Sequence, residues 1–390
     1  MFNKLNNLLN SVIEIYKNRN TTPNDAILIY PVVASPLTMQ EYIDEKDGNS
    51  NDNDNGNTNS NSNSINLDFK EPNLATINNC MIKNMHKINR QSTVNDLLMP
   101  QHIDELTTNG YTIIHNVYNE NEISEYKNEF KNWLDSIPFL KEMHESIDFH
   151  GIFKHHQVGH QRFAWLARTN TKITNIFKKI WNTDELVCSF DGCCYYSKEY
   201  YGEPQFWMHT DQSSQKKGLW CYQSLLSLTS NSERTLVLYK GSHLLHEEYF
   251  KTMKIDNPSD WHILDENYVQ NLKNEKVYVD VSAGDLVIWD SRTFHQNTAG
   301  TPSCEEERLI QYLCYLPKNA PLNTDKQNEL RELFFNDKRT TNHGPYPMSP
   351  VPEQPYTYNH YFPQNKVYID YDKLPEPQLE DLMPKIRDLL

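Results

Sequence analysis

Apolar residues recur first at helical spacing and later in short runs, and this change divides the chain into a helical part and a strand-rich part. Helical spacing predicts helices over 102–108, 123–137 and 173–180. A strand is predicted over 111–115, between the first two helices. Pro138 ends the second helix, because the residue before a proline disfavours helical backbone angles.

Short apolar runs bounded by Gly, Pro, Asn and Ser follow from residue 186 onward and predict a series of strands. The predicted strands cover 186–196, 205–209, 219–228, 235–239, 277–281, 285–289 and 308–316. Helices followed by many short strands indicate an α+β fold that is mainly β. We expect an antiparallel barrel or double sheet with flanking helices.

The polar composition divides the chain into four segments. Residues 1–46 predict an amphipathic helix and an extended run. Residues 47–66 are an Asn-rich insert without enough apolar surface to fold, so we expect it to be disordered. Residues 96–320 form the predicted main domain, and residues 321–390 a C-terminal extension that packs on or near it.

Charge and composition exclude several classes of function. The net charge of -15 argues against nucleic acid as a partner, because phosphate binding needs clustered Lys and Arg. The sequence has no apolar run long enough to span a membrane and no secretory signal, and peroxisomal targeting is not evident. Seven cysteines without a Cys-x-x-Cys pair indicate reduced thiols. We therefore expect a cytoplasmic protein with a small-molecule substrate, and the sequence leaves its oligomeric state open.

His209 and Asp211 are the first candidate metal ligands. They lie two residues apart on a predicted strand, so both side chains point to the same face. His295, which follows the strand over 285–289, supplies a third ligand. Two His and one carboxylate form the facial triad of non-haem Fe(II) oxygenases. His102 and Asp104 have the same spacing but lie in a predicted helix, where such side chains diverge.

Arg308 opens the last predicted strand, beyond His295, and is a candidate anion ligand. A guanidinium binds a carboxylate through two parallel hydrogen bonds, as the distal carboxylate of 2-oxoglutarate requires. The alternative is a surface ion pair with one of the glutamates 305–307 just before it. We favour the cosubstrate role, because the arginine starts an apolar strand.

The order of these motifs resembles the phytanoyl-CoA dioxygenase family over about residues 96–317. The resemblance rests on two kinds of feature, the metal and cosubstrate residues and three short turns or elements. These are His209, Asp211, His295 and Arg308, the turns Lys240–His243 and Ala283–Asp285, and the first helix and strand over 104–113. It departs from the family at Lys240, where a proline is usual, and at Glu233–Arg234, which replace a Gly-rich turn.

The resemblance implies a double-stranded β-helix, a cupin-like jelly roll, that holds Fe(II) and uses 2-oxoglutarate and O2, with ascorbate as a candidate supporting reductant. It makes His209, Asp211 and His295 the catalytic iron ligands and Arg308 the 2-oxoglutarate ligand. Gln223 matches a cosubstrate-pocket position, and Asn297 lies near another. Because relatives that halogenate lack the carboxylate, Asp211 implies hydroxylation, with release of succinate and CO2.

The substrate is left open between a small molecule, a lipid-like compound, an acyl-CoA and a protein side chain. Lys216, Lys217 and Arg162 are candidates for contacting nucleotide phosphates, although the acidic chain gives them no support. The alternative function is a non-catalytic 2-oxoglutarate-binding or scaffold protein on the same barrel. Zinc hydrolysis at the same triad is weaker, because it would not call for Arg308.

Other histidines are expected to be structural. His155, His156 and His160 form a cluster in which a polar loop or a substrate-pocket lining is favoured over a second metal site. His243 is expected to cap the helix that follows it, and His343 to be a loop residue after the main domain. Arg168 is expected either to form a surface ion pair or to contact an anionic substrate, and the sequence favours neither.

Overall fold

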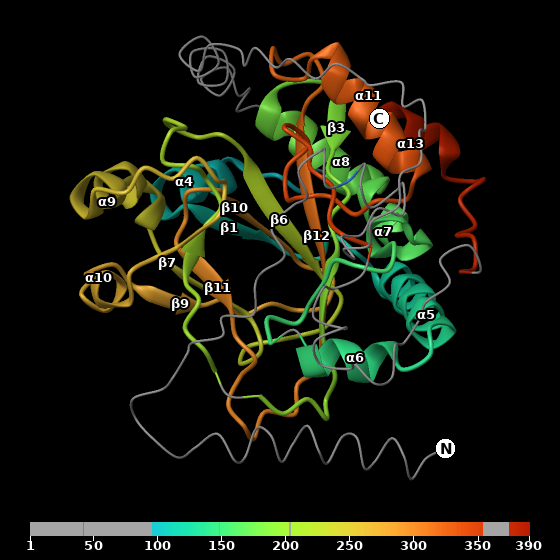
Figure 1. The fold of residues 1–390 in the computed structure, drawn as a ribbon, viewed down its shortest axis with the longest axis horizontal. Coiled ribbons are helices and arrows are strands. Elements are labelled where there is room, and N and C mark those ends of the chain that lie inside the picture. Colours follow the sequence, from blue (N-terminus) through green and yellow to red (C-terminus); the bar gives the residue numbers. More distant parts are fainter. Residues whose placement is uncertain (1–41, 43–95, 148, 203, 354–373) are drawn as a thin grey trace, which may run out of the picture. The chain divides into compact units, whose positions relative to one another are not determined.

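The computed structural model describes Tyr42 and residues 96–147, 149–202, 204–353 and 374–390 (Figure 1). All of these residues belong to one compact unit, Pro36–Leu390. The predicted N-terminal helix, extended run and Asn-rich insert lie outside the described residues. In the described part of the chain, no helix is long and apolar enough to cross a membrane.

The larger of two antiparallel sheets has the strand order β1-β10-β6-β12-β4-β2, and β3 pairs with β12 beside β4. Its strands are β1 (Tyr111–Ile114), β2 (Ile152–Phe153), β3 (Leu186–Cys188), β4 (Cys193–Tyr196), β6 (Tyr222–Ser227), β10 (Leu286–Asp290) and β12 (Arg308–Pro317). The long strand β12 lies at the centre of this sheet, so that the first residue of β12 is buried within the fold.

The smaller sheet has the order β8-β5-β11-β7-β9. Its strands are β5 (His209–Thr210), β7 (Leu236–Tyr239), β8 (His262–Ile263), β9 (Lys276–Tyr278) and β11 (His295–Asn297). Strand β11 lies between β5 and β7, and His295 is directly opposite His209 in the register. This pairing joins two segments that are far apart in the sequence.

The two sheets face each other across a shared apolar core. Leu225 and Ile310 of the large sheet pack in one cluster with Leu236 and Leu238 of the small sheet. The predicted α+β fold with antiparallel sheets and flanking helices is confirmed. Among the described strands no pairing joins the two sheets, so a closed barrel is not observed.

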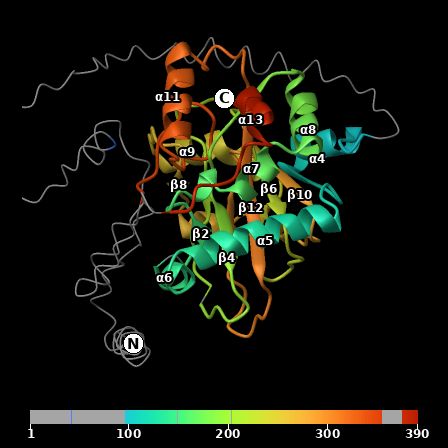
Figure 2. The same ribbon diagram turned by 90° about the vertical axis from the view of Figure 1, so that its right-hand side faces the viewer.

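Helices cover the outer face of the large sheet. They include α4 (Pro100–Asn109), α5 (Glu120–Ser136), α6 (Leu140–Ile147), α7 (Arg162–Arg168), α8 (Thr171–Trp181), α11 (Asp325–Asn336) and α13 (Met383–Leu389). Helix α5 starts at a capping box formed by Asn119 and Glu122, and it lies across the sheet in Figure 2. Alternate residues of the strands, such as Leu226 and Leu309, pack in the same cluster as the helices.

The small sheet is covered on its outer side by α9 (His246–Met253) and α10 (Glu266–Gln270), which lie together in Figure 1. Val237 of β7 packs there against Tyr249 and Val269. Both faces of each sheet are therefore occupied by apolar contacts, which fixes the register of the short strands.

The predicted strands over 219–228 and 277–281 are shorter in the structure, as β6 and β9, and two more predictions differ for reasons that the contacts explain. The single strand over 186–196 is two strands, because the chain bends at 189–192 between β3 and β4. Gly192 lies so close to the Phe153 carbonyl that a side chain at this position would clash. The strand over 205–209 shortens to β5, because the Trp207 amide donates to the Gln296 side chain instead of to a strand partner.

The C-terminal residues described by the structure pack against the main sheet. Helix α13 contacts β3, and Ile386 belongs to the apolar core under the helices. Arg331 of α11 is fully buried, and it donates to the carbonyl oxygens of Pro345 and Leu390. These contacts tie the last helix to the chain that follows α11.

Candidate metal centre

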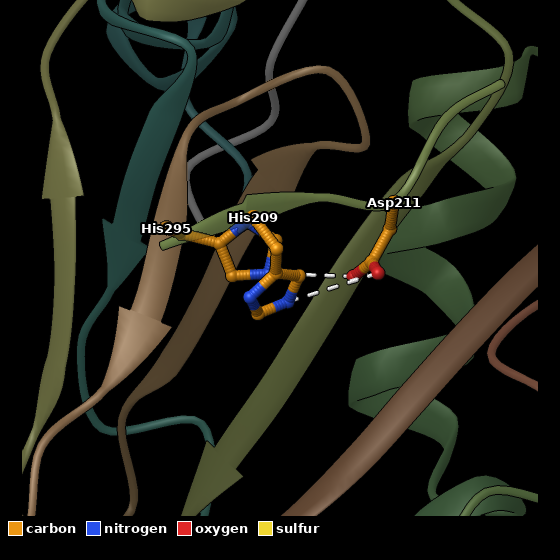
Figure 3. A group of neighbouring side chains, drawn as sticks. All are labelled: His209, Asp211 and His295. Carbon is orange, nitrogen blue, oxygen red and sulfur yellow. Dashed lines mark ion pairs between the residues drawn. The ribbon is translucent and has the colours of Figure 1, made fainter. Parts of the chain in front are cut away.

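His209, Asp211 and His295 come together at the edge where β5 and β11 pair (Figure 3). His209 starts β5, His295 starts β11, and Asp211 follows β5 directly. One ligand atom from each residue lies within 4.8 Å of the others. The carboxylate of Asp211 faces both rings, at 3.7 Å from His209 Nε2 and 3.4 Å from His295 Nε2.

The backbone fixes the orientation of both imidazoles. His209 Nδ1 lies 3.0 Å from the Trp207 carbonyl oxygen, and His295 Nδ1 lies 2.8 Å from the Thr293 carbonyl oxygen. Because a carbonyl only accepts, each Nδ1 must carry the hydrogen. In the neutral ring this leaves the lone pair on Nε2, which faces Asp211 and is available to a metal.

The charge states of the cluster also suit a metal. Burial lowers the pKa of His209, and the neighbouring His295 lowers it further, so this ring is neutral at pH 7. Burial raises the pKa of Asp211, but the two imidazoles outweigh this effect and hold it well below its usual range. The His209 nitrogen and the Asp211 carboxylate are therefore available to a metal without the loss of a proton.

Gln223 lies on β6, in the sheet opposite the metal ligands. Its Nε2 donates to Asp211 Oδ2 at 3.1 Å, and its side chain is fully buried. The sequence suggested a cosubstrate-pocket position for this residue, whereas the structure brings it into contact with a predicted metal ligand. A neutral donor at this position holds the carboxylate without competing for the metal.

Arg308 is fully buried at the start of β12. Its guanidinium donates to the Arg234 carbonyl oxygen at 2.9 Å and to Asn297 Oδ1 at 3.1 Å, and Nε has no partner. Among the described residues no carboxylate forms an ion pair with it. The alternative of a surface pair with the preceding glutamates is wrong, because Glu306 instead accepts from backbone amides such as that of Arg234.

Asn297, on the small sheet, connects Arg308 to a second residue of β12, Tyr312. It lies two residues beyond His295 on β11, and its Nδ2 donates to the Tyr312 hydroxyl at 2.7 Å. Arg308 and Tyr312 both lie on the face of β12 that looks toward the small sheet, because every second residue of a strand points to the same side. The buried guanidinium, the amide and the hydroxyl thus form one polar group inside the apolar core.

The other His-x-Asp triplet has a structural role. His102 Nδ1 accepts a hydrogen bond from the Met99 amide at 2.9 Å and so caps the start of α4. His155 and His160 lie against the backbone carbonyl oxygens of Pro352 and Arg339, at 2.8 and 2.9 Å. His243 does not cap the following helix but lies 3.2 Å from the Thr107 carbonyl oxygen.

The predicted candidates for phosphate binding are held by acids. Lys216 lies 2.6 Å from Asp260. Arg162 forms a two-point contact with Asp381, at 2.6 and 2.9 Å. Lys217 is 3.9 Å from Glu247.

A surface ion pair for Arg168 is wrong, whereas contact with an anionic substrate stays a prediction. Arg168 is fully buried and donates to the backbone carbonyl oxygens of Gly159 and Asp191. It therefore does not pair with an acid on the surface.

One histidine near the centre has no signal in the sequence. His343, expected to be a loop residue, forms an ion pair with the buried Asp191 at 2.9 Å, and its ring lies near Trp289 of β10. The two partners are far apart in the chain and share no motif. Only the folding of the C-terminal segment over the sheet brings them together.

Comparison with known proteins identifies a family and a relative. The family described as phytanoyl-CoA dioxygenase (PhyH) matches residues 106–301, half of the chain. This stretch contains all three predicted metal ligands, Gln223 and Asn297. A curated relative, Ava biosynthesis cluster protein O of Aspergillus versicolor, is 27% identical over 268 residues, which cover 62% of this chain and 85% of the relative.

Two solved structures resemble this chain only weakly, each with a TM-score of 0.42. AviO1 from Streptomyces viridochromogenes Tue57 has a TM-score of 0.42 and 16% identity, covering 59% of this chain and 99% of AviO1. EctD from S. alaskensis, solved with 2-oxoglutarate and 5-hydroxyectoine, has a TM-score of 0.42 and 14% identity, covering 60% of this chain and 81% of EctD. Because these TM-scores are low, the assignment to a family rests on the match over residues 106–301.

Proposed function

The chain belongs to the phytanoyl-CoA dioxygenase family, and on this premise we propose that it is an Fe(II)- and 2-oxoglutarate-dependent oxygenase that hydroxylates an organic small molecule. The proposal rests on two features that occur together in one core, a set of metal ligands and a buried arginine. His209, Asp211 and His295 form a ligand set for a divalent metal, and Arg308 is a buried cation without an acid.

The ligand set suits Fe(II) by its donor types. Two imidazole nitrogens and one carboxylate oxygen on one side leave the remaining coordination positions open for cosubstrate and oxygen. When bound, iron supplies the activation of O2 that couples decarboxylation of 2-oxoglutarate to oxidation of a C–H bond. His209 and His295 hold the metal through Nε2, Asp211 holds it through its carboxylate, and Gln223 orients Asp211.

Arg308 and Asn297 account for the second end of the cosubstrate. An isolated charge in a protein interior is costly unless it is paired, and Arg308 has only neutral acceptors among the described residues. The distal carboxylate of 2-oxoglutarate would provide the missing anion in a two-point contact. A hydrolytic zinc site would leave this buried cation unexplained.

The intact carboxylate at position 211 favours hydroxylation over halogenation. A halide needs the coordination position that Asp211 occupies, so the retained carboxylate favours transfer of oxygen to the substrate. The products would be a hydroxylated compound, succinate and CO2. A scaffold protein on the same fold would give no reason for a complete metal site beside Arg308, whereas non-catalytic binding of 2-oxoglutarate is separated from catalysis by the test below.

An acyl-CoA is the least favoured of the substrates considered. Binding of its phosphates needs cations that are free, whereas Lys216 and Arg162 are already engaged by Asp260 and Asp381. The name of the relative from Aspergillus versicolor refers to a biosynthesis cluster, which favours a small metabolite. We therefore propose a small organic substrate without a nucleotide.

The experiment that tests the function is succinate release from 2-oxoglutarate by protein loaded with Fe(II). We expect release that requires Fe(II) and O2 and that is lost in His209→Ala. His102→Ala, which alters the other His-x-Asp triplet, is the matched control and should retain activity in the folded protein. Binding of 2-oxoglutarate to the Mn(II)-loaded protein without any turnover would support the non-catalytic alternative. Absence of both would refute the proposal.

A further inference from the structure

The segment of residues 339–351, here called the C-terminal strap, lies against the bend between β3 and β4. Thr341 pairs with Pro350 within the strap, and its amide donates to the Phe190 carbonyl oxygen at 3.1 Å. The strap lies beyond the part of the chain that matches the family. It therefore adds side chains to the core that the family match does not account for.

His343 is the side chain of the strap that reaches toward the metal centre. Its ring centroid is 6.2 Å from that of Trp289 and 5.7 Å from that of Tyr312. Trp289 in turn lies 5.4 Å from the ring of His295. One aromatic ring thus separates His343 from a predicted metal ligand.

Asp191 fixes the orientation of His343. The carboxylate is buried and lies 2.9 Å from His343 Nδ1, while its other oxygen accepts from the Ser189 hydroxyl. Since a carboxylate accepts, Nδ1 carries a hydrogen. The opposite nitrogen, Nε2, is buried and has no hydrogen-bond partner among the described residues.

Two more unpartnered polar atoms lie nearby. Trp289 and Gln223 are direct cross-strand neighbours on β10 and β6. Trp289 Nε1 and Gln223 Oε1 are both buried, and neither has a partner in the described part of the chain. Buried polar atoms in native proteins are nearly always satisfied, so water or a polar ligand would complete this group.

The ionisation of His343 makes it a donor. Burial lowers its pKa, but Asp191 and, more weakly, Asp211 outweigh this effect and raise it to about 9. The ring is therefore protonated at neutral pH, and Nε2 carries a hydrogen. A charged donor of this kind forms stronger hydrogen bonds than a neutral one.

We propose that His343 Nε2 donates a hydrogen bond to a carboxylate or carbonyl oxygen of the primary substrate, which lies between the strap and the metal, against Trp289 and Tyr312. The proposal rests on the proposed function and adds the class of substrate. The cosubstrate does not need this donor, because Arg308 and Asn297 account for its distal carboxylate and the metal for its other end. His343 would then select substrates that bear an oxygen acceptor.

The test uses 4-fluorobenzoate, a planar carboxylate whose binding to the full-length protein is followed by fluorine NMR line width. This readout requires no metal and no turnover, so it is independent of the proposed function. We expect saturable binding to the wild type and a loss of affinity of about tenfold or more in His343→Gln, the range for hydrogen bonds to charged groups. His343→Phe, which has no donor, should bind more weakly still. Added Mn(II) should broaden the signal of the bound probe.

The matched control is His115→Gln. His115 also forms an ion pair through Nδ1, with Asp285 at 2.9 Å, but its side chain is 64% exposed. It should bind 4-fluorobenzoate like the wild type, and 4-fluorobenzylamine, which lacks the acceptor, should bind to none of the proteins. Equal affinity in wild type and folded His343→Gln, or no binding to the wild type, would overturn the proposal. A change in 2-oxoglutarate affinity alone would make His343 a cosubstrate ligand instead.

Discussion

Gln223 Nε2 lies 3.1 Å from Asp211 Oδ2, the same oxygen that faces His295 Nε2 at 3.4 Å. The amide belongs to the large sheet, whereas both metal ligands belong to the region around the small sheet. This contact sets the rotation of the carboxylate, and with it the direction of its lone pairs. The geometry of the centre therefore depends on how the two sheets are held together.

Replacement of Gln223 should weaken metal binding without removing a ligand. Gln223→Leu has a similar volume but no donor, and loss of such an outer contact typically lowers metal affinity by about 10- to 100-fold. Mn(II) affinity, measured by water-proton relaxation, checks this. Gln223→Glu should also bind more weakly at pH 7 unless its carboxyl is protonated, because it can no longer donate to Asp211. Unchanged affinity in Gln223→Leu would mean that Asp211 is oriented by other contacts.

Removal of Arg308 should affect the cosubstrate and leave the metal site intact. Breaking a buried charge pair costs about 2–5 kcal/mol, so Arg308→Ala should raise the Kd for 2-oxoglutarate by at least about 30-fold. Arg308→Lys should be intermediate, because it keeps the charge but loses the planar fork. Calorimetry on Mn(II)-loaded protein measures both.

One result would contradict the role proposed for Arg308. If 2-oxoglutarate binds equally to wild type and Arg308→Ala, another cation must hold the acid. Arg292 and Lys240 are the alternatives, but Asp290 already holds Arg292 at 2.7 Å and Glu275 lies 3.7 Å from Lys240. Arg292→Ala therefore serves as the control and should bind 2-oxoglutarate normally in the folded protein.

His209 and Asp211 should add little pH dependence to metal affinity above the ordinary imidazole range. Burial and His295 lower the pKa of His209, and the imidazoles hold the pKa of Asp211 well below its usual range. Neither group has to lose a proton on binding above about pH 6.5. Titration of Mn(II) between pH 5 and 8 should show a plateau that falls only on the acid side. A steep fall in affinity from pH 8 to pH 7 that follows the ring signal of His209 in an NMR titration would contradict the lowered pKa of His209.

Acid should destabilise the fold through two buried histidines. Burial lowers the pKa of His160 to about 3 and that of His246 to about 4. In the unfolded chain both titrate near about 6.5, so their contribution is full above that pH and is lost as the pH falls through the folded values. Each can lower the free energy of unfolding by up to about 1.4 kcal/mol per pH unit.

Urea unfolding at pH 7 and pH 5 measures this effect. His160→Gln removes one titrating group, so the difference in unfolding free energy between the two pH values should be smaller than in the wild type. His262→Gln is a milder comparison, since its pKa is also lowered by burial but the side chain is less enclosed. An unchanged pH difference in His160→Gln would show that His160 does not contribute to the acid sensitivity.

The sequence alone determined most of the helices and strands and part of the candidate metal centre. The spacing of apolar residues is set by backbone geometry within one helix or strand, so α5, α8, β6 and β12 were predicted close to their observed positions. The pair His209 and Asp211 followed from the two-residue repeat of a strand. The motif order also identified the family, and the match over residues 106–301 confirms it.

The tertiary structure decided which distant residues meet. The register of β11 against β5 places His295 opposite His209, and the packing of the two sheets brings Gln223 to Asp211 and Asn297 to Arg308. Such contacts depend on side-chain fit between separate segments, and no local pattern encodes them. The pairing of His343 with Asp191 is of the same kind, because it forms only when the C-terminal strap folds back over the sheet.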